Sequence, residues 1–179
     1  MWISDQMTWP FVETLQAAGF KKVEVFVWHK PNTMNEGGPR SIWSFEKYIL
    51  ASNHNEHAAI WNLTSSMSLL RCNVWTFDAV VGGQFETDSS TGLMVNKCQK
   101  PILLRYHELF LFVKKGSLVL DFCCGTGSLT QAALFYGCNV IACDLRCSQT
   151  DHLVQTLRAL PETSQIPVQH YDLHSKPQN

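Results

Sequence analysis

The stretch LVLDFCCGTGSLT (residues 118–130) constrains the fold of this chain more than any other segment. An apolar run ends in Asp121, and Gly125 and Gly127 follow it before a helical pattern begins at about Ser128. Glycine adopts backbone conformations that other residues avoid, and it lets backbone N–H groups approach a ligand closely. This order of features predicts a β-strand, a tight glycine turn and an α-helix, with a ligand site at the turn.

A second acidic residue indicates which ligand the turn binds. The apolar run at residues 139–143 ends before Asp144, about twenty residues after the glycine turn. An acidic residue at this place holds the ribose hydroxyls in nucleotide-type sites. The spacing is GxG rather than GxGxxG, and Asp121 precedes the turn, which together favour S-adenosylmethionine (SAM) over a dinucleotide. For a GxG motif taken alone, the alternative is an ordinary strand-to-helix turn without a ligand.

The flanking segments predict an α/β fold. From Pro101 onwards apolar residues recur with helical spacing. Further strands and helices are then expected to alternate, which is typical of a parallel sheet with helices on both faces. The expected segments are strand 117–122, helix 128–136, strand 139–143, helix 151–160 and a last strand near 167–171. Near the N-terminus we expect a helix ending at about Ala18 and an antiparallel hairpin of strands 22–28 and 42–52.

Composition sets limits on the kind of protein. The chain has 179 residues, of which 45% are hydrophobic and 16% charged, as expected for one globular domain with a substantial core. Its net charge is −1 and it has no strongly basic run, so it does not resemble a stand-alone clamp for duplex DNA. No apolar run approaches the roughly 20 residues that a membrane span requires.

The seven cysteines do not predict a metal site. Their spacing is irregular, and Cys138, Cys143 and Cys147 lack the paired C-x2-C spacing of a zinc site. No signal peptide is visible at the N-terminus. We therefore expect reduced, mostly buried thiols in an intracellular protein.

Three segments in this order resemble the amino-methyltransferases that modify adenine N6 or cytosine N4 in DNA. They are VFVWHKPN (25–32), Gln99-Lys100-Pro101 before a helix, and residues 118–130 followed by VIACDL (140–145). The order is that of the permuted type, in which the SAM loop is C-terminal to the catalytic half. The resemblance implies a Rossmann-like SAM-dependent methyltransferase fold, with a mixed sheet that contains an antiparallel hairpin.

The resemblance also implies a set of cofactor-binding residues and a partner. Asp121, Phe122, Cys123, Gly125 and Gly127 would line the methionine end of SAM. Asp144 would bind the ribose hydroxyls, and Lys100 and Pro101 would close one wall of the pocket. DNA would be the macromolecular partner.

The sequence departs from the family in one major respect. The family's catalytic tetrapeptide contains Pro-Pro followed by an aromatic residue, and no Pro-Pro occurs in these residues. We therefore assign no catalytic residue, and we expect the sheet to lack one central strand beside the strand of Asp121. The chain would be a piece of a longer enzyme, would receive the strand from a second polypeptide, or would be a non-catalytic module.

We accordingly expect a single methyltransferase-like domain over residues 1–179. Its parts would be a catalytic-half remnant with the hairpin (1–52), an irregular connection (53–97) and a SAM-binding half (98–173). Two functions remain open. The chain is part of a SAM-dependent N-methyltransferase acting on DNA bases, or it is an inactive, methyltransferase-like structural or SAM-binding module of a larger assembly.

Overall fold

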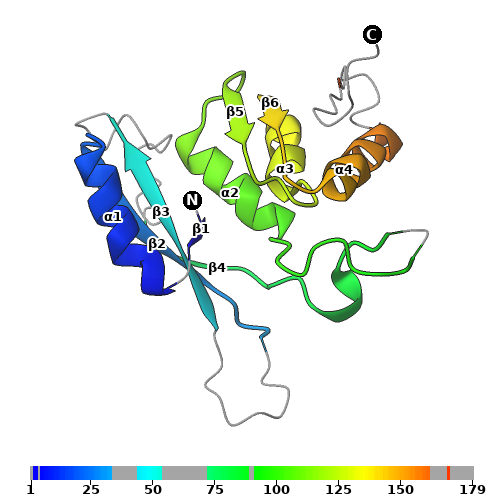
Figure 1. The fold of residues 1–179 in the computed structure, drawn as a ribbon, viewed down its shortest axis with the longest axis horizontal. Coiled ribbons are helices and arrows are strands. Elements are labelled where there is room, and N and C mark those ends of the chain that lie inside the picture. The colour runs from blue at the N-terminus through cyan, green and yellow to red at the C-terminus, as the bar shows by residue number, and fades with distance from the viewer. Residues whose placement is uncertain are drawn as a thin grey trace. The chain divides into compact units, whose positions relative to one another are not determined.

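The chain forms two compact units, each of which is described separately (Figure 1). The computed structural model describes residues 2–3, 5–33, 44–53, 72–88, 91–161 and 169. The first unit comprises Met1–Val81 and His107–Lys114, and the second comprises Gly82–Tyr106 and Lys115–Asn179.

The first unit contains a mixed four-stranded sheet. Strands β2 (Lys22–His29) and β3 (Phe45–Ser52) form the expected antiparallel hairpin. Strand β1 (Trp2–Ile3) pairs antiparallel with β3, and β4 (Val74–Thr76) pairs parallel with β2. The strand order is therefore β1-β3-β2-β4.

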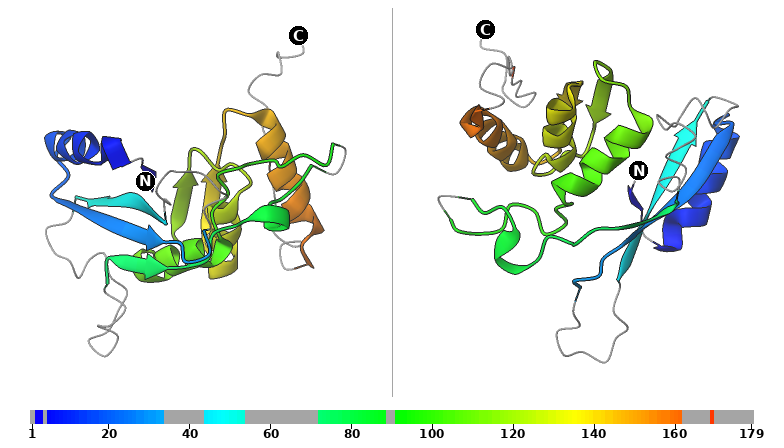
Figure 2. Two further views of the ribbon diagram at one scale, coloured as in Figure 1. Left: turned by 90° about the horizontal axis from the view of Figure 1, so that it is seen from below. Right: turned by 180° about the vertical axis from the view of Figure 1, so that it is seen from behind.

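A short 3-10 helix, η1 (Asp5–Met7), leads into α1 (Thr8–Ala17), which packs on β2 and β3 (Figure 2). The helix ends before Gly19, whose φ of +90° is readily adopted only by glycine.

Aromatic side chains form the core of the first unit. The rings of Phe26, Tyr48 and Trp75 lie 5.0–5.2 Å apart, centroid to centroid. The second half of helix α2 (Ile102–Phe112) adds His107, whose ring lies 4.7 Å from that of Trp75, and Phe112, 5.7 Å from Phe26. Aromatic pairs at these distances contribute beyond the area that they bury, so this cluster fixes β4 against the hairpin.

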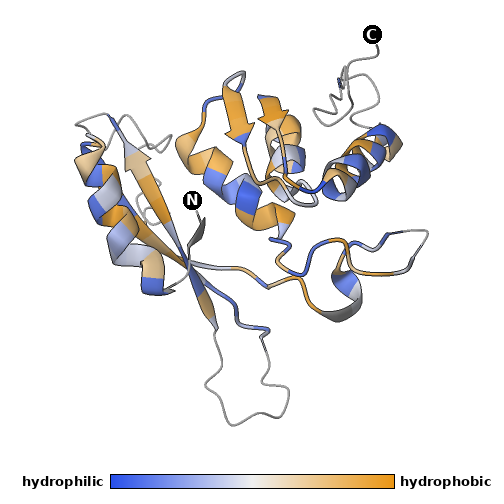
Figure 3. Ribbon diagram, viewed as in Figure 1, coloured by the Kyte–Doolittle hydropathy of each residue, from blue (hydrophilic) through white to orange (hydrophobic). Residues whose placement is uncertain are grey.

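The second unit is a βαβα arrangement. Strand β5 (Leu118–Asp121) pairs in parallel with β6 (Asn139–Ala142), and α3 (Ser128–Tyr136) makes the crossover between them. Helix α4 (Cys147–Ala159) follows β6. Figure 3 shows that β5 is apolar over most of its length. A segment with one short 3-10 helix, η4 (Gly82–Gln84), precedes α2.

The predicted α/β class and the antiparallel hairpin are confirmed. Two expectations need correction. Helix α4 begins at Cys147 and not near residue 151, because the Asp144 carboxylate accepts the Arg146 N–H at 3.0 Å and so shapes the entry to the helix. The stretch 53–97 also contains β4, which the sequence analysis missed. The strand expected near 167–171 lies almost wholly outside the described residues.

Candidate functional site: the pocket at the end of β5

The turn after β5 requires its two glycines. Gly125 has a φ of +55° and Gly127 a φ of +83°, both in the left-handed region that residues with a side chain rarely adopt. The Gly127 N–H donates to the Cys124 carbonyl at 2.7 Å, and the Gln131 N–H donates to the Gly127 carbonyl at 2.8 Å to begin α3. The predicted strand–glycine turn–helix unit is therefore present.

Asp144 is tied directly to this turn. The Gly125 N–H donates to Asp144 Oδ2 at 2.9 Å, and Oδ1 accepts the N–H of Arg146. In addition, the Cys143 N–H donates to the Asp121 carbonyl at 2.8 Å. Asp121 is the last residue of β5, and Asp144 follows the neighbouring parallel strand β6. The two residues therefore lie at the same edge of the sheet, which is where ligands bind in α/β folds.

Both glycines also allow other groups to pack closely. A Cβ at Gly125 would overlap the side-chain amide of Asn96, and a Cβ at Gly127 would overlap Leu153 of α4. Leu153 is buried against Cys124 and Leu157. Gly127 therefore permits the approach of α4 to the turn, as well as the backbone conformation of the turn itself.

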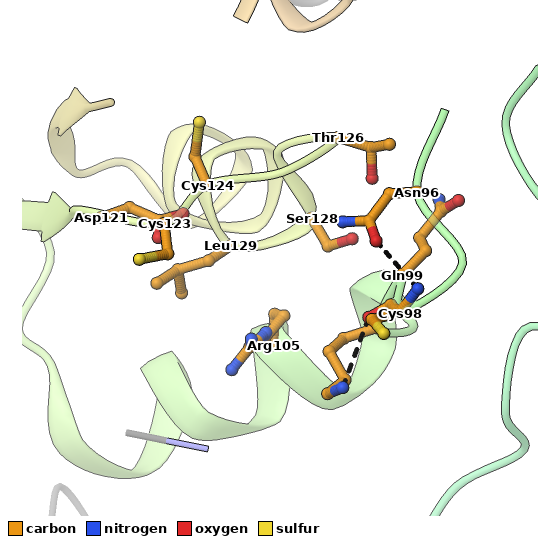
Figure 4. Close-up of a pocket in the computed structure, with 11 residues that line it drawn as sticks. Asn96, Cys98, Gln99, Arg105, Asp121, Cys123, Cys124, Thr126, Ser128 and Leu129 are labelled. Carbon is orange, nitrogen blue, oxygen red and sulfur yellow. Dashed lines mark hydrogen bonds between the residues drawn. The ribbon is translucent and has the colours of Figure 1, made fainter. Parts of the chain in front are cut away.

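A polar pocket opens at the carboxyl end of β5, within the second unit (Figure 4). It contains about 320 Å³ of empty space, including the part open to solvent. Its residues come from the end of β5 and the glycine turn, the start of α3, and the segment that leads into α2. They are Asn96, Cys98, Gln99, Lys100, Arg105, Asp121, Cys123, Cys124, Thr126, Ser128 and Leu129.

The segment before α2 is fastened to α4. Glu86 Oε2 lies 2.6 Å from His152 Nε2, and Glu86 Oε1 accepts a hydrogen bond from Gln99 Nε2 at 2.9 Å. Gln149 Nε2 also donates to the Val95 carbonyl at 3.3 Å. These bonds hold one wall of the pocket, because Gln99 and its neighbours line it.

Asp121 is the acidic residue that lines the pocket. Burial raises the pKa of its carboxyl above the ordinary value. The Arg105 guanidinium, a hydrogen bond from the Cys123 backbone and one from Thr130 Oγ1 at 3.5 Å oppose this rise, whereas Asp144 adds to it. The pocket therefore holds a carboxylate at an energetic cost, as is common where a protein keeps a charge for binding.

The three thiols of the pocket differ in environment. Cys98 and Cys123 are exposed, whereas Cys124 is buried. Burial, with the nearby Asp121 and Asp144 carboxylates and Cys143, raises the pKa of Cys124 to about 12. The Cys124 thiol therefore stays protonated and unreactive at neutral pH. The expectation of mostly buried thiols is wrong, because only Cys124 and Cys138 are buried and the other five cysteines are exposed.

Some of the predicted cofactor residues line the pocket, and the others do not. Lys100, Asp121 and Cys123 line the pocket. Pro101 directly precedes α2, and its carbonyl accepts the N–H of Arg105 at 3.3 Å. The others, which are not among the lining residues, are Phe122 (67% exposed), Gly125, Gly127 and Asp144.

Several lining residues were not predicted from the sequence, including Asn96, Arg105, Thr126 and Ser128. Thr126 lies between the two glycines and Ser128 directly follows them, so both could have been included on that ground. Arg105 follows Pro101 by four residues, which is one helical turn, so its position on the same helix face was a usable signal. Nothing in the sequence indicated that Asn96 folds onto Gly125.

The pocket-bearing fold occurs in solved structures. The M1.HpyAVI–SAM complex matches 87% of this chain and 72% of its own, with a TM-score of 0.68 and 18% identity. PvuII DNA methyltransferase, which is cytosine-N4-specific, matches 79% of this chain and 54% of its own, with a TM-score of 0.61 and 13% identity. The chain has the fold of these two proteins, one of which is a DNA methyltransferase.

A third structure with this fold is TTHA0409, a putative DNA modification methylase from Thermus thermophilus, complexed with S-adenosyl-L-methionine. It covers 88% of this chain and 60% of its own, with a TM-score of 0.54 and 16% identity. No protein-family model matches the sequence. A search of the curated proteins returns no match.

Within the part of the chain that the structure describes, no three His, Cys, Asp or Glu side chains gather as metal ligands. None of the described helices has the length and apolar character needed to cross a bilayer.

Proposed function

We propose that this chain forms the SAM-binding part of a SAM-dependent N-methyltransferase that acts on exocyclic amines of DNA bases. The observation that carries the proposal is the pocket at the end of β5, with Asp121 and Lys100 in its lining and Asp144 bonded to the glycine turn. The fold supports it, because similar solved structures include a DNA methyltransferase and proteins complexed with SAM.

The donor set of the pocket fits the cofactor. The methionine end of SAM carries an ammonium and a carboxylate, and the lining offers the Asp121 carboxylate and cationic side chains. The ribose carries two hydroxyls. Asp144 accepts one backbone N–H at each carboxylate oxygen, and each oxygen retains a further lone pair for a hydroxyl.

The residues would act by binding and orientation. Asp121 would hold the ammonium group, and Asp144 would hold the ribose hydroxyls. Lys100 and Pro101 would form one wall. The methionine end of SAM would be lined by the Phe122–Cys123 segment and by the turn glycines, Gly125 and Gly127. SAM, when bound, supplies an electrophilic methyl group on its sulfonium.

Transfer to a base amine would then depend on position and electrostatics rather than on a covalent enzyme intermediate. The choice between adenine N6 and cytosine N4 belongs to the part that holds the base. The sequence given contains no Pro-Pro motif, and we assign no catalytic residue to it. A second polypeptide or further residues of the same enzyme would supply that part.

A specific observation favours the alternative, an inactive methyltransferase-like module in an assembly. Among the described residues β5 pairs with β6 alone. On one face of this pair Leu118, Leu120 and Ile141 are 57%, 49% and 54% exposed. Apolar surface of this kind is typical of an interface. Transfer of a labelled methyl group from SAM to DNA by the purified chain would contradict this alternative.

The binding proposal is tested by thiol footprinting together with calorimetry. The purified chain is expected to bind SAM with a Kd of roughly micromolar order. With SAM at about ten times the Kd, alkylation of Cys98 and Cys123 by iodoacetamide should slow about tenfold, since only the free protein reacts. Labelling of each cysteine is read by peptide mass spectrometry.

The chain offers its own controls for this footprint. Cys72 is exposed and lies in the first unit, so SAM should leave its alkylation rate unchanged. Cys124 should remain unlabelled with or without SAM, because its pKa is about 12. Asp144→Asn should weaken SAM binding in calorimetry. A folded chain that shows neither heat of binding nor protection of Cys98 and Cys123 would contradict the cofactor assignment.

A further inference from the structure

The charges of the pocket are unequal. Two cationic side chains, Lys100 and Arg105, line it together with one carboxylate, that of Asp121. SAM carries a sulfonium and an ammonium, both positive, and a single carboxylate. Two cations beside that ligand would repel its positive groups unless the carboxylate lies next to them. The excess of positive charge in the lining therefore indicates where the carboxylate binds.

Arg105 is held in place by its helix. The backbone N–H of Arg105 donates to the Pro101 carbonyl at 3.3 Å, so Arg105 lies one turn beyond the Lys100-Pro101 pair. Figure 4 shows the Arg105 side chain extending from α2, with Ser128 and Leu129 above it. Its guanidinium also acts on Asp121, where it favours the ionised carboxylate. A cation in this position can bind the carboxylate of SAM while Asp121 binds the ammonium group of SAM.

Arginine suits this task better than lysine. Its planar guanidinium offers two parallel N–H donors that match the two oxygens of a carboxylate, whereas an ammonium acts as a point charge. Lys100 Nζ already donates to the Cys98 carbonyl at 3.3 Å, which turns part of its donor capacity toward its own segment. The geometry of its guanidinium makes Arg105 the better candidate for a two-oxygen contact.

We propose that Arg105 binds the carboxylate of the SAM methionine moiety and makes the pocket selective for ligands that carry this group. The inference rests on the proposed function, because it assigns a role within the same cofactor site. It adds a specificity-determining residue that the sequence analysis did not include.

The test compares two cofactors that differ only in the carboxylate, SAM and decarboxylated SAM. Calorimetry is performed with the wild-type chain, Arg105→Gln, Arg105→Lys and, as a matched control, Arg158→Gln. Arg158 is an exposed arginine in the last turn of α4 and is not among the pocket residues. Thermal unfolding of each variant verifies that it is folded.

Arg105→Gln should weaken SAM binding by about 10- to 100-fold, the range for loss of a charge-assisted hydrogen bond. Its affinity for decarboxylated SAM should stay within about twofold of wild type, because that ligand has no group for Arg105 to bind. Arg105→Lys keeps the positive charge but lacks the two parallel N–H donors. It should weaken SAM binding by a smaller factor and leave the affinity for decarboxylated SAM unchanged. Arg158→Gln should change neither affinity.

Equal weakening of both ligands by the Arg105 variants would show a merely structural role and overturn the inference. An unchanged SAM affinity would also overturn it. Both outcomes leave the proposed function standing, because the wild-type chain still binds SAM. A wild-type chain that binds neither ligand would overturn the proposed function and this inference with it. If Arg105→Gln does not fold, the same comparison with Arg105→Lys decides.

Discussion

Asp121→Asn is expected to weaken SAM binding by roughly 10- to 100-fold, because it removes the charged partner proposed for the cofactor ammonium. The same substitution is expected to raise the Tm of the free protein at neutral pH. The substitution is thus expected to weaken binding but to stabilise the free protein. In the free protein the Asp121 carboxylate is buried, whereas in the complex the cofactor ammonium would neutralise it.

The stability effect follows from the direction of the pKa shift. The folded-state pKa of Asp121 is raised above its ordinary value of 3.8, with burial as the largest cause. A group with a raised folded pKa contributes stability below its unfolded pKa, and this contribution is lost as the pH rises through the folded pKa. At neutral pH the ionised Asp121 therefore destabilises the fold relative to a neutral isostere such as asparagine.

Thermal unfolding from pH 7 down toward 3.8, together with calorimetry at pH 7, checks both parts. The Tm advantage of Asp121→Asn should shrink as the pH falls, because the wild-type side chain then becomes neutral as well. Asp78→Asn removes an acid of the first unit and should change neither SAM affinity nor this pH dependence. Weak SAM binding combined with a lower Tm would instead indicate that the substitution damages the turn.

Local patterns predicted most of the regular structure. Helix α3 was expected at 128–136 and lies there, because glycines in the left-handed region mark both of its ends. Strand β4 was missed because it has three residues and is defined by its pairing with the distant β2, for example Val74 with Val27. Pairing between remote segments leaves little trace in a local pattern.

The candidate site was predictable to a similar degree. The motif residues Lys100, Asp121 and Cys123 lie at the pocket because a strand end and a helix start bring them together. Asn96 was not predictable, since its place on Gly125 depends on how the segment before α2 folds back onto the turn. The close packing of Leu153 on Gly127 was likewise not predictable, since it depends on where α4 lies on the turn.

That packing contact gives the prediction with the largest effect on stability. Gly127→Ala should destabilise the protein by about 2–5 kcal/mol, the sum of left-handed backbone strain and of overpacking in a buried contact. The added methyl group would overlap Leu153 at its branched end, including Cγ at 3.0 Å. Leu153 is 4% exposed and packs on Cys124 and Leu157, so it has little room to move.

Gly137→Ala is the matched control. Gly137 ends α3 with a φ of +88°, close to the +83° of Gly127 at the other end, but a Cβ there would meet nothing within 4 Å. Its substitution should therefore show the backbone strain alone, about 1–2 kcal/mol. The difference between the two variants isolates the steric part.

A double-mutant cycle with Leu153→Ala then identifies the atoms responsible. In the Leu153→Ala background the methyl group added by Gly127→Ala has space, so its further cost should fall to about that of Gly137→Ala, 1–2 kcal/mol. Chemical unfolding of the four proteins measures the cycle. Equal costs of Gly127→Ala in both backgrounds would show that strain alone explains the effect. In that case Gly127 would serve the turn but not the packing of α4.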